Sequence, residues 1–267
     1  MLFRSYNLSV GTLTCYSNTT RGVILGVNST CSGTFNLSGT GNLLLTNSAL
    51  QVGRSDAAAT NTVGAFNQTG GTALIGTLYI GGNGASSITN TSTVSLTGGS
   101  FTASSFSRLA LGIADVASLT IGGSAQVTLP AFPTARGSNA SATITFNSTT
   151  GYLSPAAAST AYMPAGTFNN AHLTANGATF NVVSNITIGQ IFSDAPSQVG
   201  RLTKTGTGVL TLTNASTYSG ATTISAGTLA LTGLGSFNSS TPVNVVSNAT
   251  LSVTGRSDGA LTVRSEE

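Results

Sequence analysis

The chain has 267 residues, of which 40% are hydrophobic and only 6% are charged, and its formal net charge is +3 at pH 7. Periodic apolar residues at this frequency argue against intrinsic disorder, and the scattered Lys and Arg residues do not form the basic stripe that nucleic-acid binding requires. No apolar run approaches the ~18 residues of a membrane span, so we expect no membrane insertion by this segment.

Short strand units recur about every 28 residues through residues 1–169. Two positions of each unit, two residues apart, form apolar columns when the units are aligned. The first column holds Tyr6, Phe35, Phe66, Val94, Leu119 and Ile144, and the second holds Leu8, Leu37, Gln68, Leu96, Ile121 and Phe146. Alternation with a period of two indicates β-strands, and a repeat of this length is typical of a solenoid. We predict an all-β solenoid with turns of about 25–31 residues.

Each turn is predicted to hold three strands, as in TFNLSGT, NLLLT and ALQVG. The third strand ends in an aliphatic–x–aliphatic–Gly unit, in which glycine would provide the backbone conformation of a tight corner. These units are Val23–Gly26, Leu50–Gly53, Leu78–Gly81 and Leu109–Gly112. Prolines interrupt LPAFPTARGSN and GYLSPAAASTAYMPAG. Because proline cannot donate to a strand ladder, we expect corners, bulges or an edge there, with an outward loop as the main irregularity.

Two polar features lie within the predicted strands. Gln68 occupies a column that otherwise holds Leu, Ile or Phe, so its amide must find buried partners or its strand must bulge. Asn7, Asn36 and Asn67 occupy equivalent outward positions, where stacked amides can form a hydrogen-bonded ladder. We interpret this Asn column as structural.

Cys15 and Cys31 both lie in the first repeat. As a disulfide they would close a loop and stabilise the fold by roughly 3 kcal/mol. The alternative is two small buried hydrophobic side chains. The spacing of the cysteines and the single histidine do not fit a zinc site, so no metal is predicted.

Few residues could carry chemistry. Asp56 and Asp115 each follow a corner glycine by three residues, which would place their carboxylates roughly 10 Å apart on one edge of the solenoid. That separation is close to the roughly 6.5–9.5 Å of inverting glycosidases, but no aromatic platform accompanies the pair. An Asp at a corner more often caps a turn, which is the interpretation that we favour. His172 has no Ser–Asp or Cys partner in a recognisable motif and is expected on a strand or loop.

Residues 170–267 are expected to continue the solenoid with a different repeat pattern, and one segment of this region resembles a known family. Arg201–Leu231, RLTKTGTGVLTLTNASTYSGATTISAGTLAL, resembles the autotransporter-associated β-strand repeat, also called the passenger-associated transport repeat. The matching features are LTKTGTG, LTLTNASTYSG and TTISAGTLAL. The resemblance implies a right-handed parallel β-helix passenger that is exported to the bacterial cell surface or beyond. The family motif has no catalytic residues, so none is carried over.

The expected function is that of a structural or adhesive passenger segment, a rigid rod or spacer that presents a surface rich in Ser, Thr and Asn. One alternative is a glycan-binding adhesin module, with a surface or extracellular polysaccharide or a matrix protein as its partner. The other is a carbohydrate-active β-helix enzyme. We expect no enzyme activity, no cofactor and no metal, and we assign no catalytic residue. Because neither end resembles a polar cap, we expect a segment of a longer protein, able to stack end to end with neighbouring solenoid segments.

Overall fold

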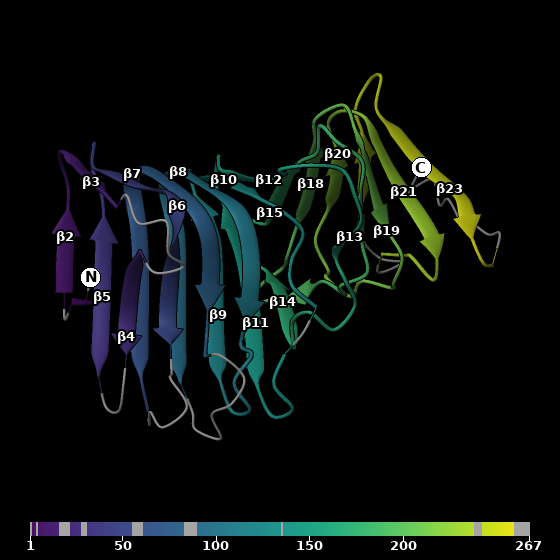
Figure 1. Cartoon of the computed structure of the whole chain (residues 1–267). Helices are drawn as coiled ribbons and strands as arrows, with labels where there is room; N and C mark the ends of the chain where they lie inside the picture. Colours follow the sequence, from purple (N-terminus) through teal and green to yellow (C-terminus); the bar gives the residue numbers. More distant parts are fainter. Residues whose placement is uncertain are drawn as a thin grey trace.

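The computed structural model describes residues 2–3, 5–15, 22–27, 31–54, 61–82, 90–134, 136–237 and 242–258. In these parts the chain forms a parallel β-solenoid with about 26 residues per turn. Successive turns lie side by side from the N-terminal strands to the C-terminal strands (Figure 1). No helix long and apolar enough to cross a membrane occurs among the described residues.

Each turn contributes to up to three faces, which we number in chain order. Face 1 consists of β2 (Ser5–Leu8), β5 (Ser32–Leu37), the first parts of β7 (Val63–Ile80) and β8 (Thr91–Leu109), β9 (Val116–Gly123), β11 (Ser141–Ser148), β14 (Asn170–Leu173) and β17 (Ser193–Asp194). Face 2 consists of β3 (Thr12–Thr14), the first part of β6 (Asn42–Arg54), the middle of β7 and β8, β10 (Gln126–Leu129), β12 (Tyr152–Pro155), β15 (Ala178–Asn181), β18 (Leu202–Thr205), β20 (Thr222–Ile224) and β22 (Val243–Val245). Face 3 begins with β1 (Leu2–Phe3), β4 (Val23–Val27) and the last parts of β6, β7 and β8, and it resumes as a separate sheet of β13 (Ser159–Met163), β16 (Ile186–Ile188), β19 (Val209–Leu212), β21 (Thr228–Gly233) and β23 (Thr250–Arg256).

The two predicted columns are confirmed along face 1. Parallel pairing brings all six residues of each column into register, from Tyr6 to Ile144 and from Leu8 to Phe146. Every side chain of the two columns except the half-buried Tyr6 is buried in the solenoid interior. Ring contacts follow the first column, with centroids 5.2 Å apart for Tyr6 and Phe35 and 5.7 Å apart for Phe35 and Phe66. Because burial of one large apolar side chain contributes about 1.5–3 kcal/mol, these columns are a main source of stability.

The predicted three strand segments per turn are found, but they are often joined. In β6 the NLLLT and ALQVG segments form one strand with a register shift between Leu45 and Ala49, and β7 and β8 run over all three faces. The glycines predicted at the corners after the third segment explain part of this path. Gly26, Gly53 and Gly81 have φ values of 68°, 69° and 98°, a region that residues with a Cβ rarely adopt.

The third apolar unit differs from the prediction at one turn. Phe106, not Leu109, pairs with Leu78, and Leu109 pairs with Ile80 after a register shift between Leu78 and Tyr79. The corner position of this turn is therefore held by Ala110, with a φ of 50°, rather than by Gly112. The prediction was wrong because SFSRLALG offers apolar residues in two phases. A one-residue bulge in β8 determines which of the two phases faces the interior, and the residue types alone do not reveal where that bulge lies.

Prolines interrupt face 3, as predicted. Residues 130–134 form no strand between β8 and β13. Phe132 fills the interior there, with its ring centroid 5.4 Å from that of Phe106 and 5.6 Å from that of Tyr162. The backbone N–H of Phe132 also donates to the carbonyl oxygen of Tyr162 at 2.8 Å, so aromatic packing and this single hydrogen bond continue the turn where regular strand pairing is interrupted.

Gln68 shows both expected solutions. Its Nε2 donates to the carbonyl oxygens of Ser100, at 3.0 Å, and Gly71, at 3.3 Å. The pairing of β7 with β8 shifts register directly after Gln68. The Nε2 group is therefore held by the backbone of its own turn and of the next one, whereas the buried Oε1 has no hydrogen-bond partner among the described residues.

The cysteines do not form the disulfide. Cys15 and Cys31 are free thiols, Cys15 half-buried and Cys31 exposed. The description of both as buried hydrophobic side chains is also wrong for Cys31, because the strand β5 begins only at the next residue.

The turns shorten toward the C-terminus. Paired residues of face 1 are 25–31 positions apart between Tyr6 and Ile144. On face 2, Phe180, Lys204 and Ile224 pair in succession at separations of 24 and 20 positions. The predicted range therefore describes the N-terminal turns, and the C-terminal turns have shorter connections.

Candidate functional site

The outward side of face 1 carries a column of polar side chains. In one register it holds Asn7, Asn36, Asn67, Ser95, Thr120, Thr145, His172 and Ser193. Within it Asn36 Nδ2 donates to Asn7 Oδ1 at 2.7 Å, and Asn67 Nδ2 donates to Asn36 Oδ1 at 2.9 Å. The predicted Asn ladder is confirmed, and it connects three turns through their side chains.

Replacing Asn36 by alanine should lower the free energy of unfolding by about 1 kcal/mol, because it removes both hydrogen bonds of a half-buried ladder. Urea denaturation followed by circular dichroism measures this loss. Ser95→Ala is the matched control, since Ser95 continues the same column and its hydroxyl has no partner among the described residues. Equal losses for the two variants would show that the ladder contributes nothing beyond strand propensity.

His172 lies half-buried on this outward column, in the strand β14. Its Nδ1 is 3.0 Å from the carbonyl oxygen of Asp194 and 3.3 Å from Ser193 Oγ. Because a carbonyl oxygen can only accept, the contact with Asp194 assigns the proton to Nδ1. A protonated Nδ1 cannot accept the proton of the Ser193 hydroxyl, so the two side chains are not arranged as nucleophile and general base.

The carboxylate of Asp194 binds backbone and hydroxyl donors of neighbouring loops. Its Oδ1 accepts from the backbone N–H groups of Gly200, at 2.6 Å, and Ser219, at 3.0 Å, and its Oδ2 accepts from Ser219 Oγ at 2.6 Å. Burial acts to raise the pKa of Asp194, but the hydrogen bonds from Ser219 and Gly200 together hold it below its ordinary value. The side chain thereby joins two turns.

Asp115 is fully buried and caps a corner, as the favoured interpretation predicted. Its Oδ2 accepts from the backbone N–H groups of Gly82, at 2.6 Å, and Gly112, at 2.8 Å, and its Oδ1 accepts from Asn90 Nδ2 at 2.7 Å. Asn90 Oδ1 in turn accepts from the hydroxyl of Thr62 at 2.7 Å. These three side chains occupy equivalent positions in three successive turns, because the residues that follow them, Val63, Thr91 and Val116, pair in register. A buried polar network therefore crosses the three turns.

Asp56 and Asp115 were paired because each was predicted to follow a corner residue by three positions, and this spacing is wrong for Asp115. The corner residue of its turn is Ala110, so Asp115 follows the corner by five positions rather than three. Asp56 lies outside the described residues. The three donors around the Asp115 carboxylate also point to a capping role rather than to a group that faces a substrate.

Lys204 is a buried cation whose burial was not predicted from the sequence. It lies in the interior of face 2, between Phe180 and Ile224 of the neighbouring turns, and it is fully buried. Its Nζ donates to the carbonyl oxygens of Gly206, at 2.6 Å, Thr205, at 2.9 Å, and Ala226, at 2.9 Å. Burial lowers the pKa of Lys204 to about 8. The alternation of Leu202-x-Lys204 was the available signal, since it assigns both side chains to the interior.

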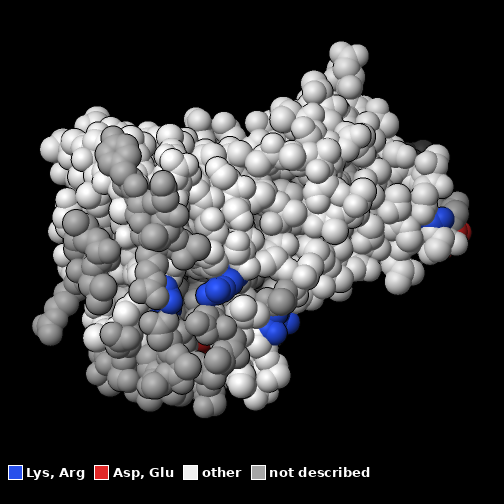
Figure 2. All heavy atoms as spheres, in the orientation of Figure 1, with Lys and Arg blue, Asp and Glu red and all other residues white. Residues whose placement is uncertain are grey.

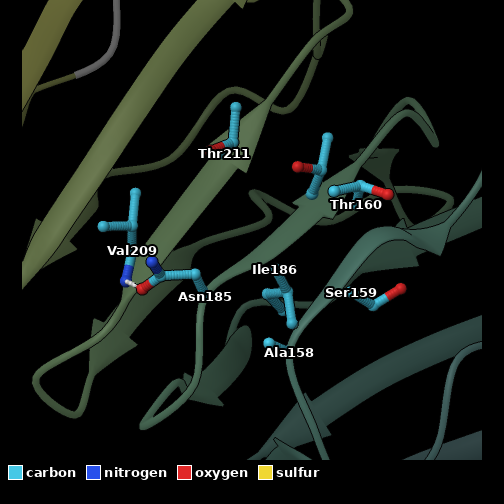
Figure 3. Close-up of a pocket in the computed structure, with 8 residues that line it drawn as sticks. Ala158, Ser159, Thr160, Asn185, Ile186, Val209 and Thr211 are labelled. Atoms are coloured by element: carbon cyan, nitrogen blue, oxygen red, sulfur yellow. Dashed lines mark hydrogen bonds between the residues drawn. The ribbon is translucent and has the colours of Figure 1, made fainter.

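A shallow, open groove of about 610 Å³ lies on face 3, lined by residues of β13, β16 and β19 and their flanking positions (Figure 3). A bulge in β13 forms one wall: Ser159 pairs with Ile186 and Met163 with Ile188, so two extra residues lie in β13. Thr160 is exposed within this bulge, whereas Tyr162 points inward.

The bulge is anchored from the interior. Tyr162 is fully buried, its hydroxyl donates to the carbonyl oxygen of Leu129 at 3.3 Å, and its ring lies against that of Phe132. Burial raises the pKa of the Tyr162 phenol. The wall of the groove is therefore held by core packing and belongs to the fold.

Charged groups are sparse on the surface. Figure 2 shows the Lys and Arg atoms of one side as a few separate blue spots, with a few red Asp or Glu atoms near them, on a largely uncharged face. Several arginines have local partners: Arg54 donates to Gln51 Oε1 at 3.0 Å, the Arg108 guanidinium lies 4.8 Å from the ring centroid of Tyr79, and Arg256 pairs with Asp258. Among the described residues no group of three His, Cys, Asp or Glu side chains could hold a metal ion.

Comparison with known families identifies one segment of the C-terminal turns. Residues 202–231 match the family model of the passenger-associated transport repeat. The chain carries a passenger-associated transport repeat. No curated protein and no solved structure matches the chain significantly. A transport repeat within a parallel β-solenoid is consistent with an autotransporter passenger, and such repeats occur in autotransporter passengers, which implies a secreted or surface location.

The transport repeat corresponds to a packing pattern in this fold. Its segment contains β18, β19, β20 and the first part of β21. Its apolar positions are buried: Leu202, Leu210, Leu212, Ile224, Leu229 and Leu231. Tyr218 is also buried, and its hydroxyl lies 2.5 Å from Thr222 Oγ1. Lys204 and the carbonyl of Ala226 both belong to the repeat, so the amine joins its first and last parts.

Proposed function

We propose that this chain is a rigid rod or spacer within an exported passenger, and that it presents a surface rich in Ser, Thr and Asn. The observation that carries the proposal is the continuous pairing of face 2, which runs strand to strand from β3 to β22. Each added turn extends the rod by about 4.8 Å and buries its apolar side chains against its neighbours. Length and stiffness are the properties that this construction supplies.

The scarcity of charge supports a role in which shape is kept under changing conditions. Only 6% of the residues are charged, so few groups couple the folding equilibrium to pH or salt. A segment outside the cell meets such changes without the buffering of the cytoplasm. The surface that it offers consists mainly of hydroxyl and amide groups.

We also propose that the chain acts without catalysis. The acids at Asp115 and Asp194 are each bound by three donors from the protein, and the Nδ1 of His172 faces a backbone carbonyl oxygen. These contacts support structural roles for the side chains that a hydrolase would need. Incubation with polysaccharides followed by product analysis tests this part, and released oligosaccharides would contradict it.

Small-angle X-ray scattering of the monomeric chain tests the rod. We expect the profile of an elongated particle whose cross-section narrows toward the shorter C-terminal turns, unchanged between mildly acidic and neutral pH. The same chain in urea is the control, because it gives the profile of a flexible polymer. A native profile that resembles the control, or a cross-section that changes with pH, would contradict the proposal.

A further inference from the structure

The groove on face 3 offers hydrogen-bonding groups that the protein itself leaves unused. Thr187 and Thr211 pair in register on β16 and β19, and their half-buried side chains line the groove. Neither hydroxyl has a hydrogen-bond partner among the described residues, and the same is true of Thr160 on the bulged wall. Three hydroxyls, each both donor and acceptor, therefore line one hollow without a partner.

Asn185 adds an amide whose orientation is fixed. Its Oδ1 accepts from the backbone N–H of Val209 at 2.9 Å, which assigns the oxygen to that side (Figure 3). The two N–H donors of Nδ2 remain without a partner in the described part of the chain. A side chain held in this way loses little conformational entropy when it binds a ligand.

The described lining of the groove offers no ion pair to a charged ligand. Among the described residues it contains no Lys, Arg, Asp or Glu, and its remaining described members are Ala158, Ser159, Ile186 and Val209. Hydroxyl and amide groups beside small apolar side chains match an uncharged ligand that carries many hydroxyls. The described lining residues include no aromatic ring, so a single sugar unit gains no stacking energy from them and binds weakly.

We propose that this groove binds an uncharged polysaccharide. The proposal rests on the rod function above and names the partner of its surface. A polymer is the fitting occupant because repeated units raise the effective concentration at a weak site, whereas one free sugar does not. No covalent step is involved, and the bound chain is retained without being cleaved.

Biolayer interferometry with immobilised dextran, mannan and β-1,3-glucan tests the proposal, with polygalacturonate and heparin as the anionic comparison. We expect retention on at least one neutral polymer, with little change between low and high salt. The double variant T187V/T211V keeps the size and strand preference of both side chains but removes their hydroxyls. It should bind about tenfold more weakly, since two hydrogen bonds to the ligand are lost.

The matched control is the double variant T120V/T145V. Thr120 and Thr145 pair in register on β9 and β11, are half-buried and face outward on face 1, away from the groove. This variant should bind as the parent chain does. The proposal is overturned if the parent chain binds none of the neutral polymers, if the two double variants lose affinity equally, or if retention occurs only on the anionic polymers and disappears in high salt. Scattering that still shows a rod in these cases would leave the rod function standing and remove the groove alone.

Discussion

Replacing Asp115 by alanine is expected to lower the free energy of unfolding by about 3–5 kcal/mol. The reason is that Gly82 N–H, Gly112 N–H and Asn90 Nδ2 would lose their acceptor in a fully buried place. Each buried donor left without a partner costs about 1–3 kcal/mol, and the network across three turns fails as a unit. Urea denaturation followed by circular dichroism measures the loss.

Two further variants make this measurement decisive. Asp115→Asn keeps one acceptor oxygen, so its loss should be about half that of the alanine variant. Asp258→Ala is the control acid, because Asp258 pairs with Arg256 at the surface and such pairs contribute about 0–1 kcal/mol. If Asp115→Ala and Asp258→Ala gave equal losses, the buried network would have no special role in stability.

The stability of the protein should rise by up to ~3 kcal/mol between pH 8 and pH 10 because of Lys204. Burial lowers the pKa of this amine to about 8 in the folded chain, whereas the unfolded chain keeps an ordinary value of about 10.4. Between these values the unfolded state binds more protons, so the free energy of unfolding increases with pH. Above about pH 10 the trend should reverse. Burial raises the pKa values of Tyr162 and Tyr218, so the unfolded state loses phenolic protons first.

Thermal and urea denaturation across this pH range, compared with Lys204→Met, isolate the contribution of the amine. Methionine nearly preserves the volume of the side chain, and it has no titrating group. We expect the variant to lose the rise between pH 8 and pH 10 and to retain the decline above it. Its stability at neutral pH is a poor diagnostic, because three carbonyl oxygens lose their donor while the desolvation penalty of a buried charge disappears. An unchanged slope in the variant would show that Lys204 does not control the pH dependence.

The columns of face 1 could be predicted because their alternation is strict. Tyr6, Phe35 and Phe66 each open a pattern of period two, and the pairing register follows from placing those side chains in one interior. The same rule failed at Leu109, where apolar residues occur in both phases and a bulge decides between them. The alternation rule was sufficient for the Asn ladder, because the outward side chains of neighbouring turns must stack when the inward side chains are in register.

Two features could not be predicted from the sequence: the burial of Lys204 in face 2 and the groove on face 3. Lys204 fits the alternation, but a cation argues against burial, and its three carbonyl acceptors come from turns whose geometry is set only in the folded chain. The groove depends on two extra residues in β13 and on Tyr162 as their anchor. Nothing in GYLSPAAASTAYMPAG specifies which of its residues leave the ladder, because small side chains fit either inside or outside.

The direction of the hydrogen bonds along the axis has a mechanical consequence. A pull on the two ends of the rod acts along the bonds between neighbouring turns, so turns separate one after another instead of shearing together. A turn that contributes about 4.8 Å to the rod contains about 26 residues, which extend to roughly 90 Å when released. Under sudden tension the terminal turns therefore unfold first and lengthen the chain, while the remaining turns stay folded.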